Sequence, residues 1–175
     1  MFPISHFNIT KTPFYYYDKT LLSNTLAKLI RLAGERNYHV HYAVKANANP
    51  EILKLIAASG IGADCVSGGE IKAALEAGFP AKKIVFAGVG KADWEIEYAL
   101  EKKIFCFNVE SAEELSVIEE LAKKKENIAS IALRINPNID AHTHEYITTG
   151  LSENKFGIPI EMLDSIFSQI QRSPH

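Results

Sequence analysis

The unit of sequence that decides the fold is GADCVSGGEIKAALEAGFPAKKIVFA, residues 62–87. It opens with a short run, Gly62 to Val66, that is typical of a buried β-strand, and it closes with a second run, Ile84 to Ala87. Between them Gly78, followed by Phe79-Pro80, marks the end of a helix. A strand, a helix and a strand in this order predict two parallel strands joined by a crossover helix.

The same alternation continues on both sides of this unit. Further strands are expected at Tyr38 to Lys45, Ile104 to Val109 and Ile128 to Ile135. Further helices are expected from Leu21 to Ala33, from the cap Asn49-Pro50 to Gly60, behind the capping-box sequence Ser111 to Glu114, and from Pro159 to Arg172. The repeat predicts an α/β protein with a parallel sheet and right-handed crossovers.

Two architectures fit five such units. A five-stranded open sheet would be complete at 175 residues. An eight-fold (β/α) barrel takes about 250 residues and would be cut off after its fifth unit. The last expected helix should lead into another strand, but the sequence stops at Pro174-His175. We therefore expect a fragment of a longer chain.

Composition and charge exclude several classes of protein. The chain is 47% hydrophobic and 23% charged, with a formal net charge of -2, as in ordinary globular proteins. Beyond the short cluster 123–125 it has no dense Lys/Arg stripe for nucleic acid, no run of the ~20 apolar residues that span a membrane, and no signal-peptide pattern. We expect a cytoplasmic protein with no nucleic-acid or membrane partner, and with Cys65 and Cys106 as buried, reduced thiols.

The first 19 residues do not follow the alternation. Residues 13–18, Pro-Phe-Tyr-Tyr-Tyr-Asp, give a dense aromatic strand signal before the first expected helix. No crossover helix precedes this strand, so it has no evident place in the parallel sheet. We expect residues 1–19 to belong to a different domain from residues 20–175.

The first expected strand of the repeat has two distinct faces. Val40, Tyr42 and Val44 form a face suited to packing under helices, and His39, His41, Ala43 and Lys45 form the other. In a barrel the second face points inward and places Lys45 at the carboxyl end of the strand, away from the surface, where such folds build their sites. Arg134 has a similar position on the last strand, and the same side also carries Asp64, Ser67 and Asn108. The set predicts a site for a charged small molecule.

Simpler interpretations of these residues stay open. Lys45 or Arg134 could pair with Asp64 in a buried ion network that binds no ligand. Residues 67–70, Ser-Gly-Gly-Glu, could hold an anion through backbone amides, although a tight turn without a ligand is the more common structure at such a junction. The loop sequence 142–145, His-Thr-His-Glu, offers two imidazoles and a carboxylate, but its spacing and the lack of a third His or Cys nearby argue against zinc. We expect no metal site.

Several motifs together resemble one family of enzymes. Residues 42–47, Tyr-Ala-Val-Lys-Ala-Asn, are similar to the signature in which alanine-racemase-like and group IV amino-acid decarboxylases carry their pyridoxal phosphate lysine. The family's further motifs follow in order at residues 62–70, 107–111 and 133–137. Residues 142–150 and 153–158 are similar to the members that act on diaminopimelate, more than to the ornithine or arginine enzymes. The likeness extends from Thr12 to the last helix.

The resemblance implies a fold and an assembly. The chain would be the N-terminal part of a (β/α)8 TIM barrel of the alanine-racemase-like, fold type III family, truncated after about five βα units. Residues 1–19 would supply the N-terminal strand of a β-rich second domain, and residues 20–175 would form the partial barrel that binds pyridoxal phosphate. The full-length protein would be a homodimer with sites shared between its subunits.

The resemblance also implies a cofactor and roles for individual residues. Pyridoxal 5'-phosphate would be attached through its aldehyde to the catalytic Lys45. Ala43 would leave room for the cofactor ring, Arg134 would donate a hydrogen bond near the phenolic oxygen of the ring, and Asp64 would orient Lys45 or Arg134. Three residues would contact the substrate or the subunit interface: His144, Tyr146 and Lys155.

The activity implied is the decarboxylation of meso-2,6-diaminopimelate to L-lysine and CO2, a carboxy-lyase reaction on a small amino-acid substrate. A fragment of this length should have little activity alone, because five barrel strands leave an open edge and an unanchored cofactor. Two alternatives stay open. The first is a related decarboxylase of carboxynorspermidine, arginine or ornithine, and the second is a noncatalytic protein that binds pyridoxal phosphate.

Overall fold

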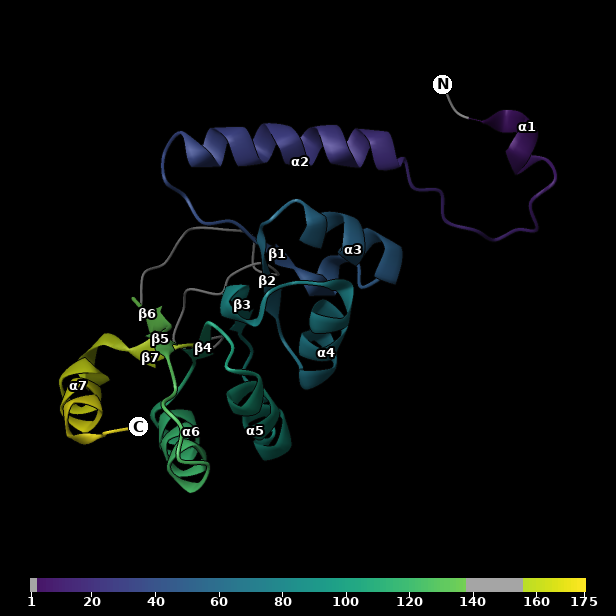
Figure 1. Ribbon diagram of the computed structural model, residues 1–175. Helices are drawn as coiled ribbons and strands as arrows, with labels where there is room; N and C mark the ends of the chain where they lie inside the picture. Colours follow the sequence, from purple (N-terminus) through teal and green to yellow (C-terminus); the bar gives the residue numbers. More distant parts are fainter. Residues whose placement is uncertain (1–2, 138–155) are drawn as a thin grey trace.

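A five-stranded parallel β-sheet forms the centre of the computed structural model, which describes residues 3–137 and 156–175 (Figure 1). The strands are β1 (His41–Ala43), β2 (Gly62–Cys65), β3 (Ile84–Phe86), β4 (Cys106–Val109) and β5 (Ile131–Leu133). They lie in sequence order, and each neighbouring pair is parallel. An open doubly wound sheet reverses its strand order, whereas a barrel always adds the next strand on the same side. The order therefore confirms a partial barrel.

Helices cover the outer side of this curved sheet. The four crossover helices are α3 (Pro50–Ala58), α4 (Gly68–Ala77), α5 (Asp93–Lys102) and α6 (Ala112–Lys124), and they follow one another around the sheet in Figure 1. The remaining helices are α1 (Ile4–Phe7), α2 (Lys19–Gly34) and α7 (Leu163–Arg172). Within the described ranges, no helix combines the length and the apolar character needed to cross a bilayer.

Local signals explain where the helices begin and end. The side chain of Asn49 accepts hydrogen bonds from the backbone N–H groups at the start of α3, from Glu51 at 3.0 Å and Ile52 at 3.4 Å. Ser111 caps α6 in the same way and accepts from Glu114 N at 3.1 Å. Gly78 ends α4 with a φ of 99°, a left-handed conformation that glycine adopts without steric cost. The caps read from the sequence are confirmed.

The hydrophobic core of the described residues lies between the outer face of the sheet and the helices. Alternate strand residues pack against the crossover helices, and they include Ala63, Cys65, Ile84, Phe86, Phe107 and Val109. Val44, just after β1, is completely buried in the same core. The residues between them in sequence, such as Asp64 and Asn108, lie on the opposite, inner face. The faces expected from the alternation are therefore confirmed.

The strands are shorter than the sequence suggests, and the last one is divided. The expected strand Ile128 to Ile135 consists of β5 and a separate β6 (Ile135–Asn136), with Arg134 between them. Strand β6 pairs in parallel with β7 (Ile158–Pro159). The backbone of Arg134 connects β4 and β7. Its N–H donates to Val109 O in β4 at 2.9 Å, and its carbonyl accepts from Ile158 N in β7 at 2.7 Å.

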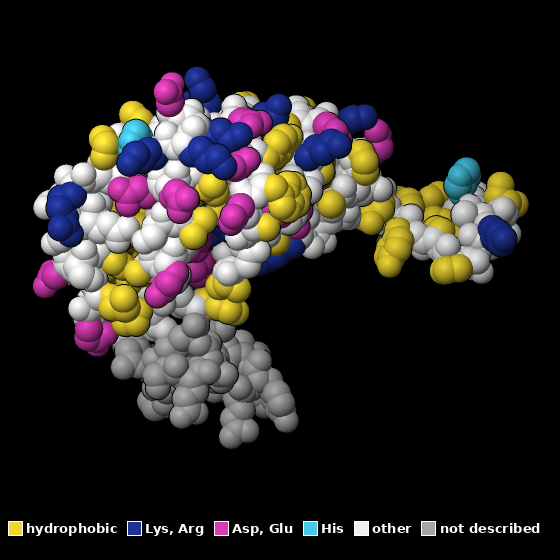
Figure 2. Space-filling model, turned by 90° about the horizontal axis from the view of Figure 1, so that it is seen from below, with side chains coloured by type: hydrophobic (Ala, Val, Ile, Leu, Met, Phe, Trp, Pro, Cys, Tyr) yellow, Lys and Arg dark blue, Asp and Glu magenta, His cyan; other side chains and the backbone are white. Residues whose placement is uncertain are grey.

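Residues 13–18 form no strand with the described part of the chain, and their assignment to a β-rich second domain stays a prediction. They belong to residues 3–18, which we call the arm. The arm projects away from the sheet and pairs with no strand in the described part of the chain (Figure 1). A strand needs a neighbour to take its backbone hydrogen bonds, and aromatic composition alone does not supply one. Figure 2 shows the arm standing clear of the body, with hydrophobic side chains on its surface. Tyr15, in this stretch, is 88% exposed.

Candidate active site

Lys45 lies in a tight turn directly after β1. The strand ends at Ala43, and residues Val44–Ala46 form one turn of 3-10 helix at the carboxyl end of the sheet. The turn is fixed from below by the fully buried Val44, whereas Lys45 itself is exposed and forms no hydrogen bond or ion pair with any described residue. The expected place at the strand's carboxyl end is confirmed. The expectation that Lys45 is not a surface lysine is wrong here, because a sheet of five strands leaves its inner face open.

Side-chain hydrogen bonds hold the backbone on both sides of this turn. Tyr42 Oη donates to the carbonyl of Asn47 at 3.1 Å. Asn47 Nδ2 donates to Tyr17 Oη at 3.0 Å, and Asn47 Oδ1 accepts from Asn49 N at 2.9 Å. Burial raises the pKa of Tyr42, so its hydroxyl stays a donor well into alkaline solution. Asn47 therefore ties the turn that carries Lys45 to the aromatic arm and to the start of α3.

Asp64 lies next to this turn on the inner face. It is the parallel-strand partner of Ala43 in the register of β1 and β2. Its Oδ1 atom is buried and accepts no hydrogen bond from the described residues. The predicted orienting contact with Lys45 or Arg134 is not present, and neither is an ion network between these residues. A buried carboxylate oxygen without a donor is costly, so this atom is suited to a group that brings its own donor.

His41 is a second titratable group on the inner face. Burial lowers its pKa, and the negative charge of Asp64 acts in the opposite direction. Its ring stacks on Phe105 with centroids 6.3 Å apart. The imidazole is therefore favoured in its neutral form at the amino-terminal part of the strand.

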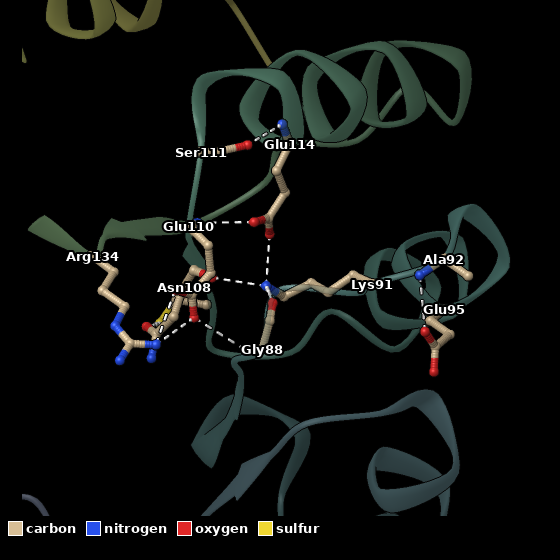
Figure 3. Close-up of polar contacts among 10 residues, drawn as sticks. Gly88, Lys91, Ala92, Glu95, Asn108, Glu110, Ser111, Glu114 and Arg134 are labelled. Atoms are coloured by element: carbon tan, nitrogen blue, oxygen red, sulfur yellow. Dashed lines mark hydrogen bonds and ion pairs between the residues drawn. The ribbon is translucent and has the colours of Figure 1, made fainter. Parts of the chain in front are cut away.

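Arg134 pairs with Glu110 instead of Asp64 (Figure 3). Its Nη1 atom lies 3.0 Å from both carboxylate oxygens of Glu110, whose side chain is only 4% exposed. The guanidinium also lies over the ring of Phe156, with 5.5 Å between Cζ and the ring centroid. Register explains the choice of partner, since Arg134 follows β5 just as Glu110 follows the adjacent β4.

Lys91 is a functional candidate that the sequence interpretation missed. Its side chain is 1% exposed, and its Nζ donates to Gly88 O at 2.6 Å, Asn108 O at 2.9 Å and Glu114 Oε1 at 2.6 Å. Glu114 Oε2 in turn accepts from Glu110 N at 2.9 Å. The sequence signal for these contacts was position alone. Lys91 follows the expected strand Ile84 to Ala87, and Glu114 lies in the first turn of the helix after the expected strand Ile104 to Val109, so both lie near the rim where strand ends meet.

The glycine-rich segment 67–70 is a capped turn. Ser67 Oγ accepts from Glu70 N at 3.2 Å, and Gly68 N donates to the buried Glu95 Oε1 at 2.7 Å. A Cβ at Gly68 would approach the Trp94 ring to 2.9 Å and Glu95 Cγ to 3.1 Å, so α4 and α5 pack closely at this glycine. The backbone N–H groups of Gly68 and Glu70, which would have to bind an anion, already donate to protein side chains. The interpretation as a turn without a ligand is the one that the structure supports.

Both cysteines are free and buried, as the sequence predicts. Burial raises the pKa of Cys65 to about 12, and it also raises the pKa of Cys106. Thiols in such surroundings are poor nucleophiles. Three further predicted residues, His144, Tyr146 and Lys155, lie outside the described residues, as does the loop 142–145 considered for zinc.

The chain belongs to the pyridoxal-dependent decarboxylases. The family described as "Pyridoxal-dependent decarboxylase, pyridoxal binding domain" matches residues 23–174. Within this class the chain is 61% identical over 167 residues to the diaminopimelate decarboxylase of Bacteroides thetaiotaomicron, with 95% of this chain and 43% of the relative aligned. It is 51% identical over 152 residues to the diaminopimelate decarboxylase of Helicobacter pylori, with 87% of this chain and 38% of the relative aligned.

Solved structures agree with the fold. Diaminopimelate decarboxylase from H. pylori, complexed with L-lysine, matches with a TM-score of 0.85 and 45% identity over 98% of this chain and 43% of that chain. The enzyme from M. jannaschii, also in complex with L-lysine, gives a TM-score of 0.86 and 37% identity over 97% of this chain and 41% of that chain. The resemblance stated from the motifs is confirmed, and the chain spans less than half the length of these relatives.

The described residues fit the cofactor of this family, pyridoxal phosphate. Lys45 offers an amine that no described side chain occupies. The neighbouring inner position, Ala43, carries only a methyl group, and the unsatisfied Oδ1 of Asp64 faces the same side of the sheet. Arg134 adds a permanent positive charge at the same rim. These groups are an amine, a small residue, an acceptor and a cation, the types that a planar, anionic aldehyde would require.

Proposed function

We propose that the protein containing this chain decarboxylates meso-2,6-diaminopimelate to L-lysine and CO2. The observation that carries the proposal is 61% identity over 95% of the chain to an enzyme of that name. Two structural relatives bound to L-lysine, which would be the product of this reaction, support it. In the reaction the bond between the α-carbon and one carboxylate carbon breaks, CO2 leaves, and a proton takes its place.

Bound pyridoxal phosphate would supply a conjugated ring that accepts the electron pair left on the α-carbon. The residues of this chain would bind and orient it. Lys45 would hold the aldehyde carbon covalently through its amine. Ala43 would leave space for the ring, Asp64 would accept a hydrogen bond at its buried Oδ1, and Arg134 would donate to an anionic oxygen.

Substrate recognition and assembly extend the proposal. We assign His144, Tyr146 and Lys155 to the substrate or to the subunit interface, on the family resemblance of the motifs that contain them. Residues 1–19 would contribute to a β-rich second domain, for which the exposed aromatic side chains of the arm offer an apolar contact. Residues 20–175 would be the partial pyridoxal phosphate-binding barrel. The complete protein would be a cytoplasmic homodimer.

The test uses the complete protein loaded with pyridoxal phosphate. We expect CO2 release to be fastest with meso-diaminopimelate, compared with ornithine, arginine and carboxynorspermidine. Lys45→Ala should lower kcat by about 10⁴-fold or more, as removal of a covalent catalytic group does. Lys54→Ala, at an exposed lysine paired with Glu51 on α3, is the matched control and should not change the rate. Preference for another amino acid would contradict the proposed substrate, and bound cofactor without turnover would contradict catalysis.

A further inference from the structure

Four charged side chains form a continuous set of contacts across the carboxyl ends of β3, β4 and β5. The set consists of Lys91, Glu114, Glu110 and Arg134, and we call it the rim network (Figure 3). Lys91 binds the Glu114 carboxylate, which accepts from the backbone N–H of Glu110, and the Glu110 side chain binds Arg134. Lys91 comes from the loop after β3, whereas Glu110 and Arg134 follow β4 and β5.

The rim network is buried except at Arg134, which is its exposed member. The side chains of Lys91, Glu114 and Glu110 are 1%, 14% and 4% exposed, whereas that of Arg134 is 47% exposed. Its two cations and two carboxylates balance, so the rim network as a whole carries no formal net charge. Lys91 has acceptors for all three of its N–H groups. Arg134 is the one member that keeps donors open toward the inner face.

Contacts fix Arg134 on three sides. Its backbone is hydrogen-bonded to Val109 on one side and Ile158 on the other. Its guanidinium meets Glu110 through Nη1 alone, and no described residue accepts from Nε or Nη2. Phe156 covers one part of the guanidinium plane. A planar, rigid fork held in this way presents its remaining donors in a defined direction.

We propose that Glu110, held in place by Glu114 and Lys91, is a positioning residue that aims the free N–H groups of Arg134 at an anionic oxygen of pyridoxal phosphate. The inference rests on the cofactor assigned under the proposed function. Glu110 does not touch the cofactor in this account. Its carboxylate orients Arg134 and offsets part of the charge that Arg134 would otherwise carry into the site.

A purely structural network is the competing explanation. In that case the contacts would only pack the loop after β3 against β4, and their loss would lower thermal stability without a specific effect on the cofactor. The two explanations differ in whether the effect of Glu110 depends on Arg134. A double-mutant cycle measures that dependence directly.

The experiment uses the complete protein, stripped of cofactor, and measures the dissociation constant of pyridoxal phosphate by fluorescence titration. Glu110→Gln should raise this constant about tenfold, by analogy with the loss of metal affinity when the hydrogen-bond partner of a metal ligand is removed. Glu101→Gln, which removes a carboxylate from an exposed pair with Lys125, is the matched control. It should stay within about twofold of the wild type.

The decisive comparison is made in an Arg134→Gln background. There Glu110→Gln should add no more than about twofold, because its effect acts through Arg134. A full tenfold loss in that background, or an unchanged constant for the single variant, would overturn the proposal. If Glu110→Gln does not fold, Glu110→Asp replaces it, since a carboxylate shortened by one methylene should also misplace Arg134. The titration contains no amino acid, so failure to turn over meso-diaminopimelate would count against the proposed substrate alone.

Discussion

Two lysines near the same rim of the sheet have opposite surroundings. Lys91 is buried and donates to three acceptors, so its amine is fully occupied. Lys45 is exposed on a turn anchored by the buried Val44 and by the hydrogen bonds of Asn47. An amine that attaches to an aldehyde must be accessible, and the amine of Lys91 is enclosed by its three acceptors. Of these two lysines, only Lys45 has an amine that is open to a ligand.

Residue-scale electrostatics also predict a pH effect at Cys65. Burial raises its pKa from 9.0 to about 12 in the folded chain. Above pH 9 the unfolded chain releases the thiol proton while the folded chain keeps it, so the free energy of unfolding should fall as the pH rises. The contribution is fully present below pH 9. Urea denaturation of the complete protein at pH 8 and pH 10 measures the change, with Cys65→Ala as the comparison. An equal fall in both proteins would contradict a role for this thiol.

At the scale of secondary structure, the sequence predicted the ends of helices better than the ends of strands. Asn49, Ser111 and Gly78 act within a few residues of their own position, so the sequence predicts their roles. Strand length depends on the neighbouring strands. The break at Arg134 and the unpaired stretch 13–18 therefore could not be read from composition.

The candidate site follows the same division. The placement of Lys45, Ala43, Asp64 and Arg134 on one side of the sheet was predicted from the alternation of side chains along a strand, and their roles toward the cofactor were predicted from the family resemblance. The side chains that these residues contact could not be predicted in this way. The contact of Arg134 with Glu110, for example, depends on the register between β4 and β5. The buried Lys91 was missed for a related reason, because an isolated lysine in a loop resembles any surface lysine until the fold surrounds it.

A helix-cap substitution tests the part of the fold attributed to local signals. Asn49→Ala removes the acceptor for two N–H groups at the start of α3 and should lower the free energy of unfolding by about 1 kcal/mol. Asn49→Ser keeps an acceptor at the cap and should recover most of the loss. Chemical denaturation of the complete protein measures both. Equal losses for the two variants would mean that the cap does not stabilise α3.

At the scale of the whole molecule, helices cover one side of the sheet, and no described helix covers the other side. The inner face carries the proposed cofactor residues, and the chain spans 43% of the relative from B. thetaiotaomicron. Strands at an open edge leave backbone groups unpaired, and an open inner face does not exclude water from a reacting group. Function therefore belongs to the complete protein.

The uncovered inner face of the sheet predicts low activity for the 175-residue chain by itself. The chain should release CO2 from meso-diaminopimelate far more slowly than the complete protein, because the inner face is not closed over the cofactor. Parallel assays at equal molar concentrations and saturating pyridoxal phosphate make the comparison. A rate for the isolated chain comparable with that of the complete protein would contradict the requirement for a closed barrel.

Borohydride reduction of the complete protein with bound pyridoxal phosphate tests the central claim most directly. Reduction makes the link between cofactor and lysine permanent, and peptide mass mapping then locates the added mass. We expect the added mass on the peptide containing Lys45, and we expect Lys45→Ala to abolish it. An adduct on the peptide containing Lys91, or on any other lysine of the protein, would show that Lys45 does not hold the cofactor.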